Sequence, residues 1–111
     1  MASRKTHLYT RTQFIEDIQM AIGAEIDGVA GIETLYKTLT ISEVLNRKHP
    51  AVYYIQRRLL ALGYTEVGRV DGIADHKFTS AVMHFQADKG CDIDGELTAR
   101  SMTWQKLLGM K

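Results

Sequence analysis

Apolar residues recur at intervals of three and four along three stretches of the chain, which is the spacing of one face of an α-helix. The stretches run from Phe14 to Ile22, from Val52 to Leu62 and from Phe78 to Phe85. Polar and glycine-containing segments separate them and are expected to be loops rather than strands. The pattern therefore predicts an all-α protein.

Local signals predict where these three helices begin and end. Thr10 and Gln13 have the spacing of a capping box, and Asp75 is placed to cap the third helix. Pro50 suits the first turn of the second helix. A glycine, which accepts left-handed backbone, follows each helix: Gly23, Gly63 and Gly90.

The remaining segments predict only short elements. Helices are expected from Glu33 to Thr38 and from Ser101 to Leu108, and the second of these would bury Trp104. Residues Tyr64 to Val70 hint at extended structure because two valines flank a glycine there. That run is too short to form a sheet of its own.

The chain contains an internal repeat. The segment from Ile18 to Gly28 aligns without a gap with the segment from Phe85 to Gly95, and both end in Asp-Gly. Such a pair suits a tight turn, because aspartate accepts backbone N–H groups and glycine tolerates positive φ. The predicted structural turn residues are Asp27, Gly28, Asp71, Gly72, Asp94 and Gly95.

The repeat predicts how the chain is divided. Residues 1–41 form a degenerate helix-loop-helix half-repeat, residues 42–49 a polar linker, and residues 50–111 a fuller domain of three helices. A two-helix unit of about 30 residues buries too little surface to be stable alone. The two parts are therefore expected to pack together.

Composition limits the function classes. The chain has 111 residues, 45% hydrophobic and 24% charged, which is typical of one small globular domain. Its net charge of +1 disfavours binding to nucleic acid. No apolar run approaches the roughly 20 residues of a membrane span, and no signal peptide is expected in the sequence.

The residues suited to metal or nucleophilic chemistry do not form a recognisable site. Cys91 is the single cysteine, so no internal disulfide is possible. His76 and His84 would lie about 12 Å apart along a helix, too far for one zinc ion, and His84 with Cys91 lacks a third ligand. The Asp-Gly turns lack the alternating oxygen ligands of a calcium loop. No catalytic residue, metal or cofactor is predicted.

The order of motifs between Pro50 and Leu108 resembles the peptidoglycan-binding-domain-1 family. That family has a glutamine-bearing helix ending in Leu-Gly-Tyr, an Asp-Gly-Ile turn, a helix ending in Phe-Gln, a second Asp-Gly turn and a final helix starting with Thr-Trp. The matching segments here are Ile55–Tyr64, Val70–Ala74, Phe78–Gln86, Ile93–Gly95 and Thr103–Trp104. Residues Phe14 to Leu39 look like a degenerate half-copy.

The resemblance implies a small helical bundle that binds bacterial peptidoglycan without cutting it. The chain is also similar to the C-terminal wall-binding region of N-acetylmuramoyl-L-alanine amidases, the endolysins of Clostridium-like bacteria and their bacteriophages. The implied partner is an amidase catalytic domain, covalently linked or associated, and the implied location is the bacterial cell wall. The chain departs from the family at Asp75, where glycine is usual, and in a longer turn at Arg100–Met102.

Peptidoglycan offers hydroxyls, amides, carboxylates and flat sugar faces, which aromatic rings and charged donors bind. Tyr53 and Arg57 are among the candidates, while Trp104 is expected in the core. Adjacent arginines on a helix point about 100° apart, so at most one of Arg57 and Arg58 faces a shared groove. The predicted ligand-binding residues are Tyr54, Arg58, Tyr64, Arg69, His76 and Lys77.

Three other functions stay open from the sequence. The chain could itself be a lytic enzyme, which would require turnover of cell walls. It could be an oligomerisation or protein-interaction module of a lysin, including a homo-oligomer. A helix-turn-helix DNA-binding protein is the third, and the balanced charge argues against it.

Overall fold

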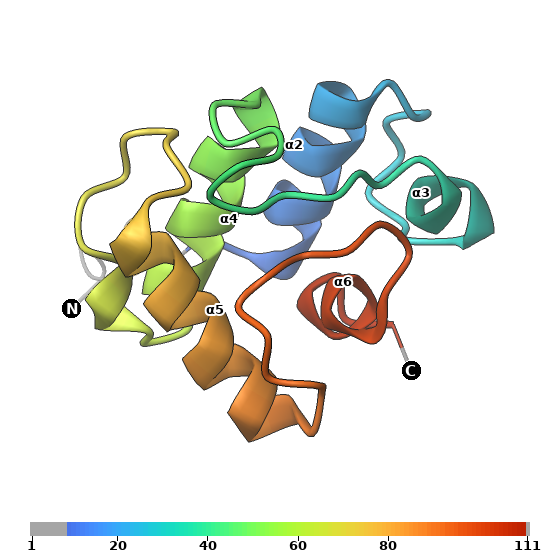
Figure 1. The fold of residues 1–111 in the computed structure, drawn as a ribbon. Helices are drawn as coiled ribbons and strands as arrows, with labels where there is room; N and C mark the ends of the chain where they lie inside the picture. Colours follow the sequence, from blue (N-terminus) through green and yellow to red (C-terminus); the bar gives the residue numbers. More distant parts are fainter. Residues whose placement is uncertain (1–8, 111) are drawn as a thin grey trace, which may run out of the picture.

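The computed structural model describes residues 9–110, in which five α-helices and one 3₁₀-helix are joined by loops (Figure 1). Extended pairing in this part of the chain is limited to one antiparallel bridge between Ile41 and Leu97. The all-α prediction is confirmed. The elements are α2 (Arg11–Ile22), α3 (Ile32–Tyr36), α4 (Pro50–Ala61), η1 (Thr65–Val67), α5 (His76–Lys89) and α6 (Met102–Leu107).

The ends of the longer helices follow the predicted local signals. Thr10 and Gln13 form both halves of a capping box at the start of α2. The Asp75 side chain accepts a backbone N–H bond at the start of α5. Gly23 and Gly90 end α2 and α5 in the left-handed conformation. These signals work from sequence alone because a cap acts within one helical turn.

The segment between α4 and α5 differs from the predicted extended structure. Thr65–Val67 form the 3₁₀-helix η1, and the Val67 N–H group donates to the Tyr64 carbonyl at 3.3 Å. The tight turn directs the Val67 side chain into the core, where it is buried. Gly68 then reverses the chain with a φ of 70°. The segment thus buries Val67 through a 3₁₀ turn and not through the extended structure expected from the two valines that flank the glycine.

One hydrophobic core joins all of the longer helices. It contains Phe14 of α2, Ile55 of α4, Phe78 of α5 and Trp104 of α6, each fully buried. The Trp104 indole N–H donates to the Leu39 carbonyl at 2.9 Å. Helix α4 packs against α2 on one side and against η1 and α5 on the other (Figure 1). The N-terminal and C-terminal parts therefore share a single core.

A buried glutamine in each of three helices holds the Asp-Gly turn that follows it. In α5, Gln86 Nε2 donates to the Asp94 carboxylate at 2.9 Å and to the Thr103 hydroxyl at 3.0 Å. Its Oε1 accepts the N–H groups of Asp94 and Gly95. The corresponding contacts join Gln19 to Asp27, Gly28 and Thr34, and Gln56 to Asp71 and Gly72. The three turns are thus built alike.

This likeness allows the surfaces of α2, α4 and α5 to be compared position by position. A Cβ added to the turn glycine would lie within 4 Å of the side chain three residues before the glutamine in all three units. Those side chains are Glu16, Tyr53 and Met83. The residues one place after the glutamine are Met20, Arg57 and Ala87, and all are exposed. The same scaffold thus accommodates unlike side chains at both positions.

Backbone and side-chain hydrogen bonds hold the segment 42–49. The Ser42 hydroxyl accepts two N–H bonds within the segment, and the Arg47 carbonyl accepts the Ala74 N–H group at 2.7 Å. The His49 ring accepts the Ala51 N–H group at 3.0 Å and so caps α4. The division of the chain into residues 1–41, 42–49 and 50–111 stays a prediction.

Candidate functional site

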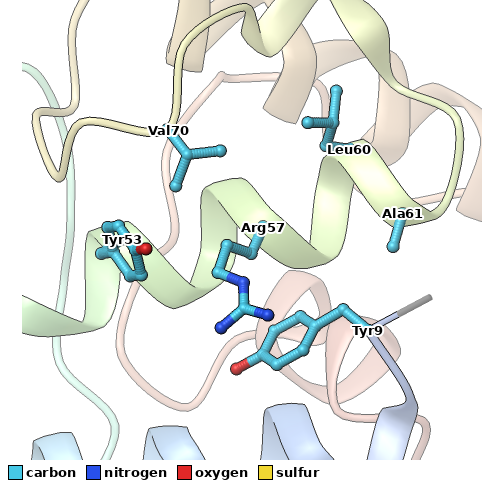
Figure 2. A pocket seen from close by; sticks show the side chains of 6 residues that line it. All are labelled: Tyr9, Tyr53, Arg57, Leu60, Ala61 and Val70. Atoms are coloured by element: carbon cyan, nitrogen blue, oxygen red, sulfur yellow. The ribbon is translucent and has the colours of Figure 1, made fainter. Parts of the chain in front are cut away.

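A groove of about 410 Å³ runs along the exposed side of α4 (Figure 2). Four of its lining residues occur at spacings of three or four in α4 and therefore share one helix face. The other two come from the segment before α2 and from the loop between η1 and α5. The lining residues are Tyr9, Tyr53, Arg57, Leu60, Ala61 and Val70.

The Arg57 guanidinium lies over the Tyr9 ring, with its central carbon 4.1 Å from the ring centroid. Figure 2 shows the Arg57 side chain extending from α4 toward that ring. The contact is a cation–π interaction, which fixes the position of a side chain that is otherwise exposed. Among the ion pairs of the described chain, none includes Arg57. Its N–H groups are therefore available at the groove.

Contacts on three sides hold the Tyr9 ring in place. The ring is buried and packs edge-on against Phe14, with the centroids 6.1 Å apart. The Tyr9 hydroxyl donates to Asp17, and Arg58 Nη1 donates to the backbone carbonyl of Tyr9 at 2.6 Å. Burial, together with the bond to Asp17, raises the pKa of the Tyr9 hydroxyl well above its ordinary value. The hydroxyl therefore remains a neutral donor, and the ring is a fixed platform for Arg57.

Tyr53 forms the opposite end of the groove. Its ring meets Tyr54 edge-on, with centroids 5.4 Å apart and an interplanar angle of 88°. Tyr53 is 42% exposed, so part of its surface is accessible to a ligand. The groove lining thus combines aromatic, cationic and aliphatic side chains.

The predicted ligand-binding residues lie in different surroundings. Tyr54 and Arg58 are half-buried and support the groove from behind, through Tyr53 and Tyr9 respectively. Burial, and then the charge of Arg11, lowers the pKa of the Arg58 guanidinium. Arg69 is exposed and directly precedes Val70 of the groove wall.

None of these three lines the groove, and the same is true of the other three predicted residues, Tyr64, His76 and Lys77. Tyr64 is 8% exposed and donates its hydroxyl to Asp88 at 2.8 Å. Burial and that bond raise the pKa of Tyr64 to about 12. His76 is exposed, 3.9 Å from the Glu43 carboxylate, and Lys77 is exposed beside Gly68. Ligand contacts by these residues stay predictions.

Sequence reasoning missed Tyr9 and did not select Tyr53 and Arg57. Tyr53 and Arg57 were recognisable as a ring and a donor on one helix, four residues apart. Nothing local indicates that Tyr9 reaches Arg57, which is far away in the chain. The contact depends on how α2 packs against α4.

The aspartates of the repeated turns serve the backbone. Asp71 Oδ1 accepts from the Gln56 side chain at 3.0 Å and from the Ile73 N–H group at 3.0 Å. These two bonds hold the pKa of Asp71 below its ordinary value. At Asp27, the Val29 N–H group and then the Gln19 side chain have the same effect on its pKa. The ionised carboxylates thus stabilise the turns.

His84 lies between two carboxylates on the outer face of α5. Its Nδ1 is 2.7 Å from Glu66, and its Nε2 is 3.7 Å from Asp88. The carboxylates contact opposite ring nitrogens, so they brace the imidazole rather than converge on one point. Cys91 is buried. Within residues 9–110, no three His, Cys, Asp or Glu side chains are grouped as metal ligands.

Comparison with known proteins identifies one family. Residues 48–107, more than half of the chain, match the family described as "Putative peptidoglycan binding domain". The matched region contains α4, η1, α5 and α6, and hence the α4 side of the groove. Searches of curated proteins and of solved structures found no significant match. Among the described helices, none is both long and apolar enough to cross a membrane.

Family membership implies association with the bacterial cell wall. The groove with its exposed Tyr53 and Arg57 lies within the matched residues, apart from the contribution of Tyr9. The resemblance noted between Pro50 and Leu108 agrees with the matched residues. On this evidence the chain belongs to the peptidoglycan-binding domain family.

Proposed function

We propose that this protein is a non-catalytic module that binds peptidoglycan through the α4 groove and holds a lytic amidase against the bacterial wall. The amidase domain is either covalently linked or associated. Tethering raises the local concentration of the catalytic domain at its substrate, so even a weak module increases the rate of wall cleavage.

The observation that carries this proposal is the pairing of Tyr53 and Arg57 on one exposed face. At the equivalent positions α2 has Glu16 and Met20, and α5 has Met83 and Ala87. The fold therefore does not require an aromatic ring or an arginine at these two positions, because α2 and α5 have neither. A ligand requirement explains the presence of both on α4, because exposed rings and guanidinium groups are the side chains that dominate binding surfaces.

Sedimentation with purified sacculi tests wall binding directly. The variant Tyr53→Met/Arg57→Ala carries the residues of α5 at both positions and should fold normally. We expect wild-type protein to pellet with sacculi and the double variant to bind about 30-fold more weakly, as for loss of a hot spot of roughly 2 kcal/mol.

Arg100→Ala is the matched control for charge. Arg100 lies over the Tyr36 ring, 5.9 Å from its centroid, away from the groove lining. It should pellet like the wild type. Equal pelleting of the double variant and the wild type would exclude the groove as the wall-binding surface, and failure of the wild type to pellet would exclude the function.

Fusion to an amidase catalytic domain tests the tethering role. The fusion should release wall fragments at lower enzyme concentration than the catalytic domain alone, and the double variant should remove this gain. The chain without a fused enzyme should release no fragments.

A protein-interaction module of a lysin is the second candidate. Exposed apolar side chains on α3 and the adjoining loop favour it, since Ile32, Tyr36 and Val44 are each more than half exposed. Light scattering separates the two functions, because assembly without retention by sacculi would support the second.

A further inference from the structure

We propose that the α4 groove recognises the carboxylate of a peptidoglycan stem peptide, and not the glycan strand. This inference rests on the proposed function, because it names the part of the wall polymer that the same groove binds. It follows from the geometry of Arg57, the local balance of charge and the composition of the groove walls.

The stacking of Arg57 determines which of its surfaces meets a ligand. The Tyr9 ring covers one face of the guanidinium at 4.1 Å, so the N–H groups along its edge remain for hydrogen bonding. An arginine held in this way presents a planar fork of donors, which matches the two oxygens of a carboxylate. A rigid fork loses little side-chain entropy when the ligand binds.

The charges around Tyr9 favour an anion. Arg57 lies on the Tyr9 ring, Arg58 donates to the Tyr9 carbonyl, and Arg11 is close enough to Arg58 to lower its pKa. Among the residues that the structure describes, one carboxylate, that of Asp17, contacts Tyr9, and it already accepts the Tyr9 hydroxyl bond. Positive charge is therefore in excess at this end of the groove, and an incoming carboxylate would balance it.

The groove walls suit a short peptide better than a sugar. Sugar hydroxyls need acceptors as well as donors, yet within residues 9–110 the lining side chains offer only tyrosine hydroxyls as acceptors and include no carboxylate or amide. Leu60, Ala61 and Val70 instead offer an aliphatic surface of the size that covers methyl groups. Stem peptides combine alanine methyl groups with free carboxylates, which are the two chemistries that this groove accommodates.

The test compares how four ligands bind to the intact chain. They are whole sacculi, glycan strands stripped of their stem peptides, a soluble stem tetrapeptide with a free C-terminal carboxylate, and the same peptide amidated at that end. Sedimentation measures binding to the sacculi, and calorimetry or NMR titration measures binding to the soluble glycan strands and to the peptides.

We expect the peptide with a free carboxylate to bind. Amidation should weaken its binding about 10-fold to 100-fold, which corresponds to the loss of charge-assisted hydrogen bonds. Arg57→Lys keeps the charge but removes the planar fork of donors, and it should weaken binding of the free peptide by a similar factor. The Arg100→Ala control should bind the peptide like the wild type. The stripped glycan strands should show no binding to the protein in the same titration.

The outcomes separate the two proposals. If stripped strands bind the wild-type protein as tightly as the free peptide does, or if amidation has no effect, the stem-peptide inference is wrong while wall binding stands. If sacculi fail to retain the wild-type protein, the proposed function itself is wrong. The ligand comparison uses the wild-type chain, so it decides the question even if an Arg57 variant fails to fold.

Discussion

The buried glutamines show how one side chain organises a whole turn. Gln86 is almost fully buried, and its amide makes three donor contacts and two acceptor contacts around the Asp94-Gly95 turn. Buried backbone N–H groups need such partners, because an unsatisfied polar group in the core is costly. The glutamine side chain therefore supplies the hydrogen-bond partners that the backbone of the turn would otherwise lack.

We predict that Gln86→Leu lowers the free energy of unfolding by about 3 kcal/mol, because the Asp94 and Gly95 N–H groups lose their acceptor. Urea denaturation followed by circular dichroism measures this change. The neighbouring exposed substitution Ala87→Gln serves as the control and should cost about 0.5 kcal/mol or less. A loss of under 1 kcal/mol for Gln86→Leu would show that water replaces the amide.

At the scale of elements, each Asp-Gly turn folds back against the helix that precedes it. A Cβ at Gly95 would lie 2.6 Å from a methyl carbon of Thr79 and 3.1 Å from Met83 of α5. Gly90, which ends the same helix, has nearly the same φ of 74° but nothing within 4 Å of an added Cβ. Substitution of Gly90 therefore measures backbone strain alone, and substitution of Gly95 measures strain together with close packing.

We predict that Gly90→Ala costs about 1 to 2 kcal/mol, the strain of a left-handed residue. Gly95→Ala should cost at least 1 kcal/mol more, because α5 and the turn must also move apart. Thermal unfolding of the two variants under the same conditions measures the difference. Equal losses would mean that the turn moves away from α5 without cost.

At the scale of the whole molecule, hydrogen bonds and burial couple stability to pH. Burial lowers the pKa of His49, whose neutral ring caps α4. The pKa values of Asp27 and Asp71 are lowered by their bonds to the turns. Each group has a lower pKa in the folded chain than in the unfolded chain, so its stabilisation is present above the unfolded value and lost as pH falls through the folded one.

We therefore predict that stability falls in two stages on acidification. The first stage begins below about pH 6.5 as His49 gains a proton, and the second begins below about pH 4 as the turn aspartates do. Melting temperatures measured across this range report both stages. His49→Asn, which caps without titrating, should remove the first stage and leave the second.

Asp71→Asn is the companion variant for the lower stage. It keeps an oxygen acceptor at the turn but not the charge, so it should reduce the slope below pH 4 and leave the His49 stage unchanged. Identical pH profiles for the wild type and both variants would contradict the assignment of these groups.

The sequence by itself determined the three longer helices and the Asp-Gly turns. Capping side chains, helix-ending glycines and apolar spacing act over a few residues, so α2, α4 and α5 follow from local rules. The repeat of Gln and Asp-Gly was also visible in the sequence, because the glutamine and the Asp-Gly pair are the same number of residues apart at α2 and at α5. The family resemblance extended this to peptidoglycan binding.

Only the tertiary structure decided which side chains line the groove. Tyr64 and Tyr53 are both tyrosines of the predicted domain, yet packing against Phe85 and α5 buries the first and leaves the second exposed. Arg57 and Arg58 are neighbours, and the position of Tyr9 directs one to the groove and the other to a backbone carbonyl. Spacing along a helix defines its faces, but only the packing of distant segments determines which face stays open.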